Sequence, residues 1–390
     1  MPSKLSRSKK ILSAALAALL LAGAAAPRAA AYSQSGPLKV ATAADVNRMG
    51  ADFVDGPWSS WTAGDTRYWL SSDNWGKYHH LCAGPVDQPV TDVVYAKKTT
   101  ARTFTNAAAF DLGRKIRGED YCVNMPWFMN IYKDSGGGLL AFLHIENYQE
   151  IRRPGCGILQ PAYDWMRRIF YPLPRICNAG APDETQALGL AYSTDNGRTF
   201  RFLGYIADRG PGNIQGAPYL IKDGYFYVYY NKANTNVARA PVDEVLAAAK
   251  NGAVTEWKAF YAGAWEEPAL GGKASQLNLF GISHTQAAYS TYDGKYYMAL
   301  TMMNWGEGDT WVKLYQSSDC VNWEYYQTVV LDPNDKYGVK AMGWQYSFIA
   351  DAGAQENATV GRKFYVYCAD YYDSAARLTD VYRWTIDLAE

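Results

Sequence analysis

The sequence predicts an all-β fold, a five-bladed β-propeller, from three observations. An aromatic-rich hairpin recurs five times, its copies follow one another at steps of about 70 to 85 residues, and the chain between them shows almost no helical periodicity. Aromatic residues make up 15% of the 390 residues, with 31 tyrosines, and aromatic side chains favour strands. Blades of four strands around a central channel account for this pattern.

The repeated unit is a turn followed by a strand crowded with aromatic residues. Two copies carry Asp-Gly at the turn, a strong hairpin signal because both central residues of a type I′ turn need positive φ. Alternate residues of each strand are expected to bury against the neighbouring blade. A β-sandwich and a parallel β-helix compete with this fold, but the units are too regular for the first and too long for the second. The copies are GDTRYWLSS (64–72), GGGLLAFLHIE (136–146), KDGYFYVYYN (222–231), YDGKYYMALTMMN (292–304) and VGRKFYVYCADYY (360–372).

The first residues of the chain predict where the folded domain begins. Residues 1–31 have the layout of a secretory signal peptide, with a basic start, an apolar run and an A-x-A-like cleavage site near Ala31. Residues 32–390 are expected to form one propeller domain with a cysteine-bracketed insert at 152–180. The one clear helical stretch, 241–252, is expected between blades three and four.

Charge and hydropathy limit the partners. Without residues 1–31 the chain holds 33 basic and 38 acidic residues, a balance that argues against a nucleic-acid binder. No later stretch approaches the roughly 18 uninterrupted apolar residues of a membrane span. We therefore expect a secreted protein, extracellular or periplasmic, with no membrane span and no nucleic-acid partner, and we expect it to be a monomer.

Cysteine usage predicts cross-links. Six cysteines in an exported chain predict up to three disulfides. Cys156 and Cys177 are the preferred local pair because they bracket a Pro-rich segment that lacks periodicity. None of the spacings resembles a zinc site. The six are Cys82, Cys122, Cys156, Cys177, Cys320 and Cys368.

Residues 193–200, STDNGRTF, match the pattern S-x-D-x-G-x-T-[FW] of the Asp-box, a motif of sialidases and other propellers. Ser193, Asp195 and Thr199 are expected to hydrogen-bond a turn, while Phe200 packs between blades. A degenerate second copy, SSDCVNWE, follows at 317–324. The motif supports the fold and says little about catalysis.

The segment NIQGAPYLIKDGYFYVYY (213–230) resembles the third blade of the five-bladed furanosidase-like glycosidases, notably glycoside hydrolase family 43. The spacing of the units extends this resemblance loosely over about 50–390. It implies a sugar-cleaving site in the central channel. An Asp entering blade one would be the general base, a second-blade Asp would orient the substrate, and a third-blade Glu would be the general acid.

Carried over residue by residue, the resemblance is incomplete. Asp55, in GADFVDGPW, takes the position of the base, with Asp52 as the alternative, and Asn130 takes the second-blade position. Gln215 stands where the acid is expected and has no titratable proton. Cleavage normally needs two carboxyl groups, about 5–5.5 Å apart for retention or 6.5–9.5 Å apart for inversion. A hydrolase built on this chain therefore needs another acid.

Glu146 is the best replacement acid. It ends the second aromatic strand in AFLHIEN, and His144 lies two residues earlier on the same strand face. This segment also resembles secreted propellers of poorly characterised activity that carry His-x-Glu at this point. The competing interpretations are a rim ion pair between Glu146 and Arg152 or Arg153, and a turn role for Asp55.

Four further side chains complete the candidate site as substrate-binding residues. His284, in GISHTQAAYS, enters blade four where the resembling hydrolases place a channel histidine, sometimes beside a bound calcium. A buried structural hydrogen bond is the other interpretation. Gln345 enters blade five in the same manner. Trp58 and Trp127 lie near blade entries, where rings stack on sugars, although core packing explains tryptophans equally well. The sequence indicates no definite cofactor, and the resemblance allows a channel-bound calcium.

Three hypotheses follow. The first is a secreted glycoside hydrolase acting on polysaccharide or oligosaccharide side chains, including furanosides, with Asp55 as base and Glu146 as acid. The second is a carbohydrate-binding propeller without catalysis, for which Gln215 is the main argument. The third is a sialidase-like hydrolase, which the Asp-box allows, although the arginine triad of sialidases cannot be assembled from the sequence.

Overall fold

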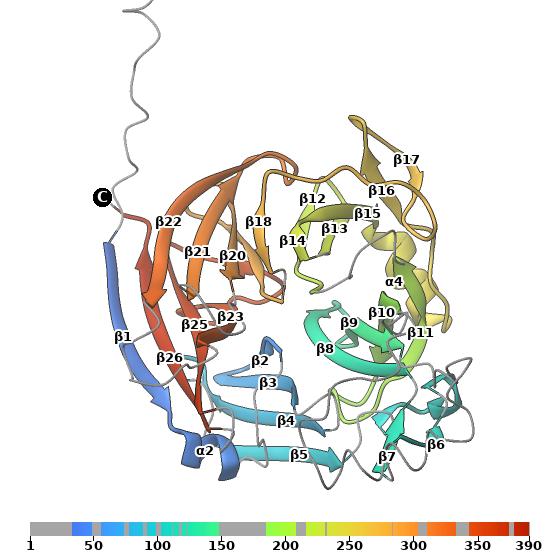
Figure 1. Ribbon diagram of the computed structural model, residues 1–390, viewed down its shortest axis with the longest axis horizontal. Coiled ribbons are helices and arrows are strands. Elements are labelled where there is room, and N and C mark those ends of the chain that lie inside the picture. The colour runs from blue at the N-terminus through green and yellow to red at the C-terminus, as the bar shows by residue number, and fades with distance from the viewer. Residues whose placement is uncertain are drawn as a thin grey trace, which may run out of the picture.

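A computed structural model shows a five-bladed β-propeller, so the predicted all-β fold is confirmed (Figure 1). Every blade is built on antiparallel strand pairs, and the blades are arranged around a central axis (Figure 1). The structure describes residues 33–48, 56–73, 78–88, 92–98, 103–110, 112–116, 119–122, 124–147, 185–207, 216–230, 232–282, 284–302, 310–332, 343–373 and 378–389.

The blades follow one another in chain order. Blade one holds β2 (Ser59–Ala63), β3 (Thr66–Asp73), β4 (Tyr78–Pro85) and β5 (Asp92–Lys98). Blade two holds β8 (Asn124–Lys133), β9 (Leu139–Asn147), β10 (Thr185–Ser193) and β11 (Arg201–Ala207). Blade three holds β12 (Tyr219–Lys222), β13 (Tyr225–Tyr230), β15 (Asn236–Pro241), β16 (Lys258–Tyr261) and β17 (Ala264–Pro268).

Blades four and five are more elaborate. Blade four holds β19 (Ala287–Ser290), β20 (Tyr296–Met302), β21 (Thr310–Ser317) and β22 (Trp323–Asp332), extended by β14 (Lys232–Asn234), β18 (Phe280–Ile282) and β24 (Thr359–Val360). Blade five holds β23 (Gly343–Asp351), β25 (Lys363–Asp373), β26 (Leu378–Asp387) and β1 (Ser33–Ala41). Between blades lie α2 (Ala43–Arg48), η2 (Ala107–Phe110), β6 (Leu112–Ile116) and β7 (Glu119–Cys122).

The ring is closed by the start of the described chain, which the sequence did not reveal. Strand β1 pairs with β26 and forms the outermost strand of blade five, so the last blade is built from both ends of the chain (Figure 1). Lys39 of β1 contacts Asp380 of β26 at 2.5 Å, and Gln34 donates to the carbonyl of Val329 in blade four at 3.0 Å. These contacts tie the first strand to two blades.

The predicted helix forms, but its predicted place is wrong. Helix α4 (Val242–Lys250) connects β15 to β16 inside blade three and does not separate blades three and four. Acidic residues in its first turn and Lys250 in its last turn suit the helix dipole. The helix contacts β10, so it lies on the side of blade three that faces blade two.

The five repeated strands are β3, β9, β13, β20 and β25, the second strand of each blade, and their side chains fill the seams between blades as predicted. Phe142 of β9 is fully buried and stacks on Tyr219 of blade three, with ring centroids 4.8 Å apart. Phe226 and Trp257 of the same blade contact it edge-on. Other buried clusters join blade three to four, four to five, and five to one.

The Asp-box turn has the predicted hydrogen bonds. Asp195 accepts from the hydroxyl groups of Ser193 and Thr199, at 2.8 and 2.6 Å. Phe200 is fully buried, and its ring centroid lies 5.9 Å from that of His79 in blade one. The turn therefore packs blade two against blade one.

Two of the six cysteines are free thiols, so the chain cannot form three disulfides. Cys320 and Cys368 are buried thiols, and burial raises the pKa of Cys320 to about 12. The preferred pair, Cys156 and Cys177, lies outside the described residues, as do the predicted signal peptide and most of the predicted insert. None of the helices in the described part of the chain has the length and apolar character that a membrane crossing requires.

His79 predicts a specific loss of stability in acid. Its ring is fully buried against Phe128, and its Nε2 donates to the carbonyl of Gly197 at 3.0 Å. Burial lowers the pKa of His79 from 6.5 to about 3. At pH values between these two pKa values, His79 is protonated in the unfolded chain and neutral in the folded chain. The free energy of unfolding should therefore fall as the pH falls, by up to about 1.4 kcal/mol per pH unit.

The matching measurement is urea unfolding at several pH values between 7 and 4. In His79→Gln the amide still donates to Gly197 but does not titrate in this range, so the stability of the variant should depend less on pH. Equal slopes in the two proteins would show that other groups cause the acid sensitivity.

Candidate functional site

Polar side chains join all five blades around the propeller axis. The amide nitrogen of Asn130, on β8, donates to the carbonyl of Ala217 in blade three at 2.9 Å and to that of Thr285 in blade four at 3.4 Å. Gln286 donates to the carbonyl of Trp58 in blade one at 3.1 Å and accepts from the backbone of Ile349 in blade five at 3.0 Å. These buried bonds fix the position of each inner strand.

An interruption in one inner strand supplies these groups. Strands β18 and β19 both pair with β20, and residues 284–286 lie between them without strand pairing of their own. In this run the side chain of Gln286 bonds to blades one and five, while its backbone carbonyl still accepts from the backbone of Ala299 in β20 at 3.3 Å. The hydroxyl of Thr285 lies 2.7 Å from that of Ser347 in blade five.

Asn130 occupies the position where the resemblance expects an aspartate, and its contacts explain why an amide suits this structure. Both of its partners are carbonyl oxygens, so a carboxylate there would face two acceptors without a donor. Asn130→Asp should lower the free energy of unfolding by about 2–3 kcal/mol at pH 7. Because this environment raises the folded-state pKa of the new carboxyl, stability should recover toward pH 4. Urea unfolding at pH 7 and pH 4 measures both effects, and a variant as stable as the parent at pH 7 would contradict the assignment.

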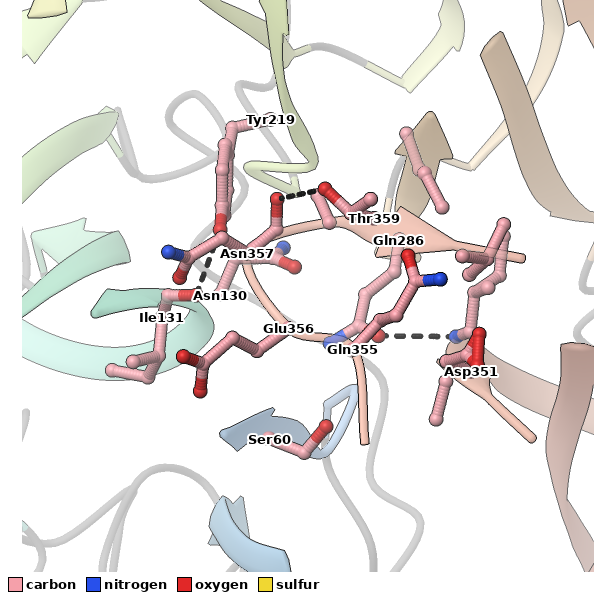
Figure 2. Close-up of a pocket in the computed structure, with 16 residues that line it drawn as sticks. Ser60, Asn130, Ile131, Tyr219, Gln286, Asp351, Gln355, Glu356, Asn357 and Thr359 are labelled. Carbon is pink, nitrogen blue, oxygen red and sulfur yellow. Dashed lines mark hydrogen bonds between the residues drawn. The ribbon is translucent and has the colours of Figure 1, made fainter. Parts of the chain in front are cut away.

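One end of the axis is closed by the segment that connects β23 to β25 and includes β24. We call residues 351–360 the axial strap (Figure 2). Glu356 accepts from the backbone of Thr62 at 3.1 Å, and Asn357 exchanges two hydrogen bonds with the backbone of Lys133, at 2.7 and 2.8 Å. Thr62 and Lys133 lie at the ends of β2 and β8, so the strap closes the end at which these inner strands finish. We call this the exit end and the opposite one the entry end.

The cavity above the strap is too small for a sugar. It measures about 30 Å³ and is lined by Asn130, Tyr219, Gln286 and the strap (Figure 2). A single water molecule needs about 10–15 Å³ measured in this way. The cavity therefore has room for water but not for a saccharide.

Glu146 and His144 lie near the entry end of blade two. In the β8–β9 ladder His144 pairs with Trp127 and Glu146 pairs with Met125, both near the start of β8. The Nε2 atom of His144 lies 3.2 Å from Oε1 of Glu146, and Gln186 of β10 donates to the same oxygen at 3.3 Å. The His144 side chain is 1% exposed and that of Glu146 is 15% exposed. The carboxyl therefore reaches solvent while its partner is buried.

Two aromatic groups flank this pair. The ring of Trp127 lies 5.6 Å from that of His144, and the ring of His284 lies 5.0 Å from it on an edge-to-face approach. His284 enters from blade four, so the predicted site residues of blades two and four do meet. We call Trp127, His144, Glu146, Gln186 and His284 the entry cluster.

The contact between His144 and Glu146 can hold one proton in two ways. With the carboxyl ionised, the imidazole Nε2–H donates to Oε1. With the carboxyl protonated, its O–H donates to Nε2 of the neutral imidazole. Nδ1 of His144 makes no hydrogen bond with any residue that the structure describes. In either arrangement the partly exposed carboxyl stays within hydrogen-bond distance of the buried imidazole.

The remaining predicted site residues fall into two groups. Trp58 is 3% exposed and stacks on Phe348 of blade five, so it packs in the core and offers no ring face to a sugar. Asp55, Asp52 and Gln215 lie outside the described residues, and for Gln345 only the backbone, in β23, is described. Among the described residues, no three His, Cys, Asp or Glu side chains gather as metal ligands.

Gln186 and Gln286 were missed at the sequence level. Gln186 follows the segment 148–184, and no periodicity there places it opposite Glu146. Gln286 did carry a signal, because His-Thr-Gln interrupts an otherwise apolar strand. Only the pairing of β18 and β19 with the same partner shows what that interruption means.

Comparisons with known proteins found similarity only among solved structures. No family model and no curated protein matches the chain. Among solved structures, the catalytic domain of the Coprinopsis cinerea GH62 alpha-L-arabinofuranosidase is 8% identical, covers 91% of this chain and 96% of its own, and has a TM-score of 0.47. The GH43 endo-arabinanase from Bacillus licheniformis is 10% identical over 85% of this chain and 94% of its own, with a TM-score of 0.45. Trypanosoma rangeli sialidase is 11% identical over 85% of this chain and 44% of its own, with a TM-score of 0.41.

Proposed function

We propose that the protein is a secreted glycoside hydrolase in which Glu146 protonates the leaving group. The observation that carries the proposal is the entry cluster, where a 15% exposed carboxyl is held by a buried histidine and a buried glutamine. General acid catalysis needs a carboxyl that reaches the substrate and exchanges its proton. The contact with His144 supports both requirements.

The second carboxyl of the proposed reaction is Asp55, acting as general base. Support comes from its neighbour in the chain: Gly56 is buried, and a Cβ added there would lie 3.8 Å from Cε of Met129 on β8. The chain therefore enters blade one against the strand that also carries Trp127. A base and an acid from adjacent blades suit a bond cleaved between them.

The proposed substrates are side chains of polysaccharides and oligosaccharides, with furanosides tested first because 213–230 resembles a furanosidase blade. A binding propeller without catalysis is the second candidate. Gln215 at the expected acid position favours it, because that residue has no proton to give.

A substrate panel separates the two candidates. The recombinant mature protein should hydrolyse at least one member of a panel of arabinan, arabinoxylan, galactans and aryl glycosides, and Asp55→Asn should abolish that activity. Affinity electrophoresis on the same polysaccharides measures binding independently. Sugar retention without turnover across the panel would replace the hydrolase by the binding propeller.

A further inference from the structure

A second cavity lies at the exit end of blade two, away from the entry cluster. It measures about 570 Å³, inside the ~300–1,000 Å³ range of small-molecule sites. Four segments contribute to it: the β8–β9 turn, the Asp-box turn, the last residues of α4, and the 103–110 segment through Thr105. The entry cluster lies at the opposite ends of β8 and β9, so the two places are distinct.

A buried carboxylate forms one wall of this cavity. Asp134 is 3% exposed and accepts from the backbones of Gly136 and Gly138 at 2.7 and 2.9 Å and from the hydroxyl of Tyr192 at 2.5 Å. Burial opposes its ionisation, but the hydrogen bonds from Tyr192 and the turn outweigh it and lower the pKa of Asp134. Lys250 adds an ion pair at 3.2 Å. The charge of Asp134 is therefore already compensated within the protein.

A second cation on the rim has no such compensation. The Arg201 side chain is exposed and makes no hydrogen bond or ion pair with any described residue, while its backbone pairs with Tyr192 in the β10–β11 ladder. Its position is nevertheless restricted, because a Cβ added at Gly252 would lie 2.1 Å from Cζ of the guanidinium. The side chain thus lies on the backbone just beyond α4, whose carbonyl end attracts a cation. Lys250 uses one of its three N–H donors on Asp134. The cavity therefore presents cationic N–H donors from Arg201 and Lys250.

The rest of the lining accepts hydrogen bonds. The hydroxyl hydrogens of Tyr192 and Thr199 are donated to Asp134 and Asp195, which leaves their oxygen lone pairs as acceptors. Thr194 and Thr105 add two hydroxyls at the exposed rim. A ligand that carries an anionic group and several hydroxyl groups matches both halves of the lining.

We propose that this cavity binds a small hydroxylated organic anion of the sugar-acid class, with its carboxylate against Arg201 and Lys250 and its hydroxyl groups against Tyr192, Thr194 and Thr199. The site makes no use of Glu146. The proposal therefore stands apart from the proposed hydrolase, and each can fail without the other.

The test is isothermal titration of the mature protein with galacturonate, galactose and inorganic sulfate. Galacturonate should bind at least tenfold more tightly than galactose, and its affinity should fall as NaCl is raised because the contact is ionic. Arg201→Gln should weaken galacturonate binding at least tenfold, and Thr194→Trp should block it by filling the rim. Arg198→Gln is the matched control, because Arg198 is exposed on the same turn but does not line the cavity.

Four outcomes decide the question. Loss of binding in Arg201→Gln and Thr194→Trp, with unchanged binding in Arg198→Gln, supports the proposal. Equal affinity for galactose and galacturonate would overturn it, as would an Arg198→Gln effect as large as that of Arg201→Gln. Binding of sulfate alone would reduce the cavity to an inorganic anion site. Circular dichroism of every variant excludes unfolding as the cause of lost binding.

Discussion

Glu146→Gln is expected to lower kcat/KM by ~10²–10⁴-fold on substrates whose leaving group is an alkoxide. This is the range that general acid catalysis contributes. The amide keeps the shape of the side chain and still hydrogen-bonds His144, but it has no proton to transfer. Binding of the intact saccharide should change little, because the rest of the entry cluster is unaltered. Initial rates on the best substrate of the panel, with affinity measured separately, provide the test.

A matched substitution elsewhere controls for loss of charge. Glu324 is exposed on β22 of blade four, and Glu324→Gln should retain the parental rate. His144→Gln should reduce the rate less than Glu146→Gln, because His144 positions the carboxyl and does not itself protonate the substrate. A Glu146→Gln protein that keeps most of its activity would remove Glu146 from the mechanism.

Phe142→Ala is expected to destabilise the protein by about 3–5 kcal/mol, the usual range for removing a buried ring from a core. Phe142 is fully buried at the seam between blades two and three, where it stacks on Tyr219 and meets Phe226 and Trp257. Flat β-sheet faces on both sides cannot collapse into the space that the ring leaves. Urea unfolding measures the difference in the free energy of unfolding.

Tyr325→Ala is the control for this substitution. Tyr325 lies on β22 and is 56% exposed, so its removal should change the free energy of unfolding by less than about 0.5 kcal/mol. Similar losses in Phe142→Ala and Tyr325→Ala would contradict the conclusion that the aromatic strands act through the seams between blades.

The fold could be predicted because each blade repeats the same local chemistry. The turn and the aromatic strand of period two can be recognised in each copy separately, and the five copies predict five blades. The closing strand β1 could not be predicted in this way, because its partner β26 is at the other end of the chain. The predicted position of the helix was wrong for a related reason. Strands β16 and β17, which follow α4, belong to blade three only through their pairing with β15 and with each other.

The site was predicted in part. His144 and Glu146 share a strand face, so period-two geometry alone places them together. Their contact with His284 depends on how blade four is interrupted near the axis, and Gln186 reaches Glu146 only through the β9–β10 register. Residue type alone could not predict the role of Trp58, because this tryptophan at a blade entry packs in the core.

The dependence of rate on the leaving group tests the central claim most directly. A glycoside with a 2,4-dinitrophenyl leaving group departs without protonation, whereas a methyl or sugar leaving group needs a proton. We predict that Glu146→Gln retains most of the parental rate on the first and loses at least about 100-fold on the second. An equal loss on both kinds of substrate, or no loss on either, would contradict the assignment of Glu146 as the acid.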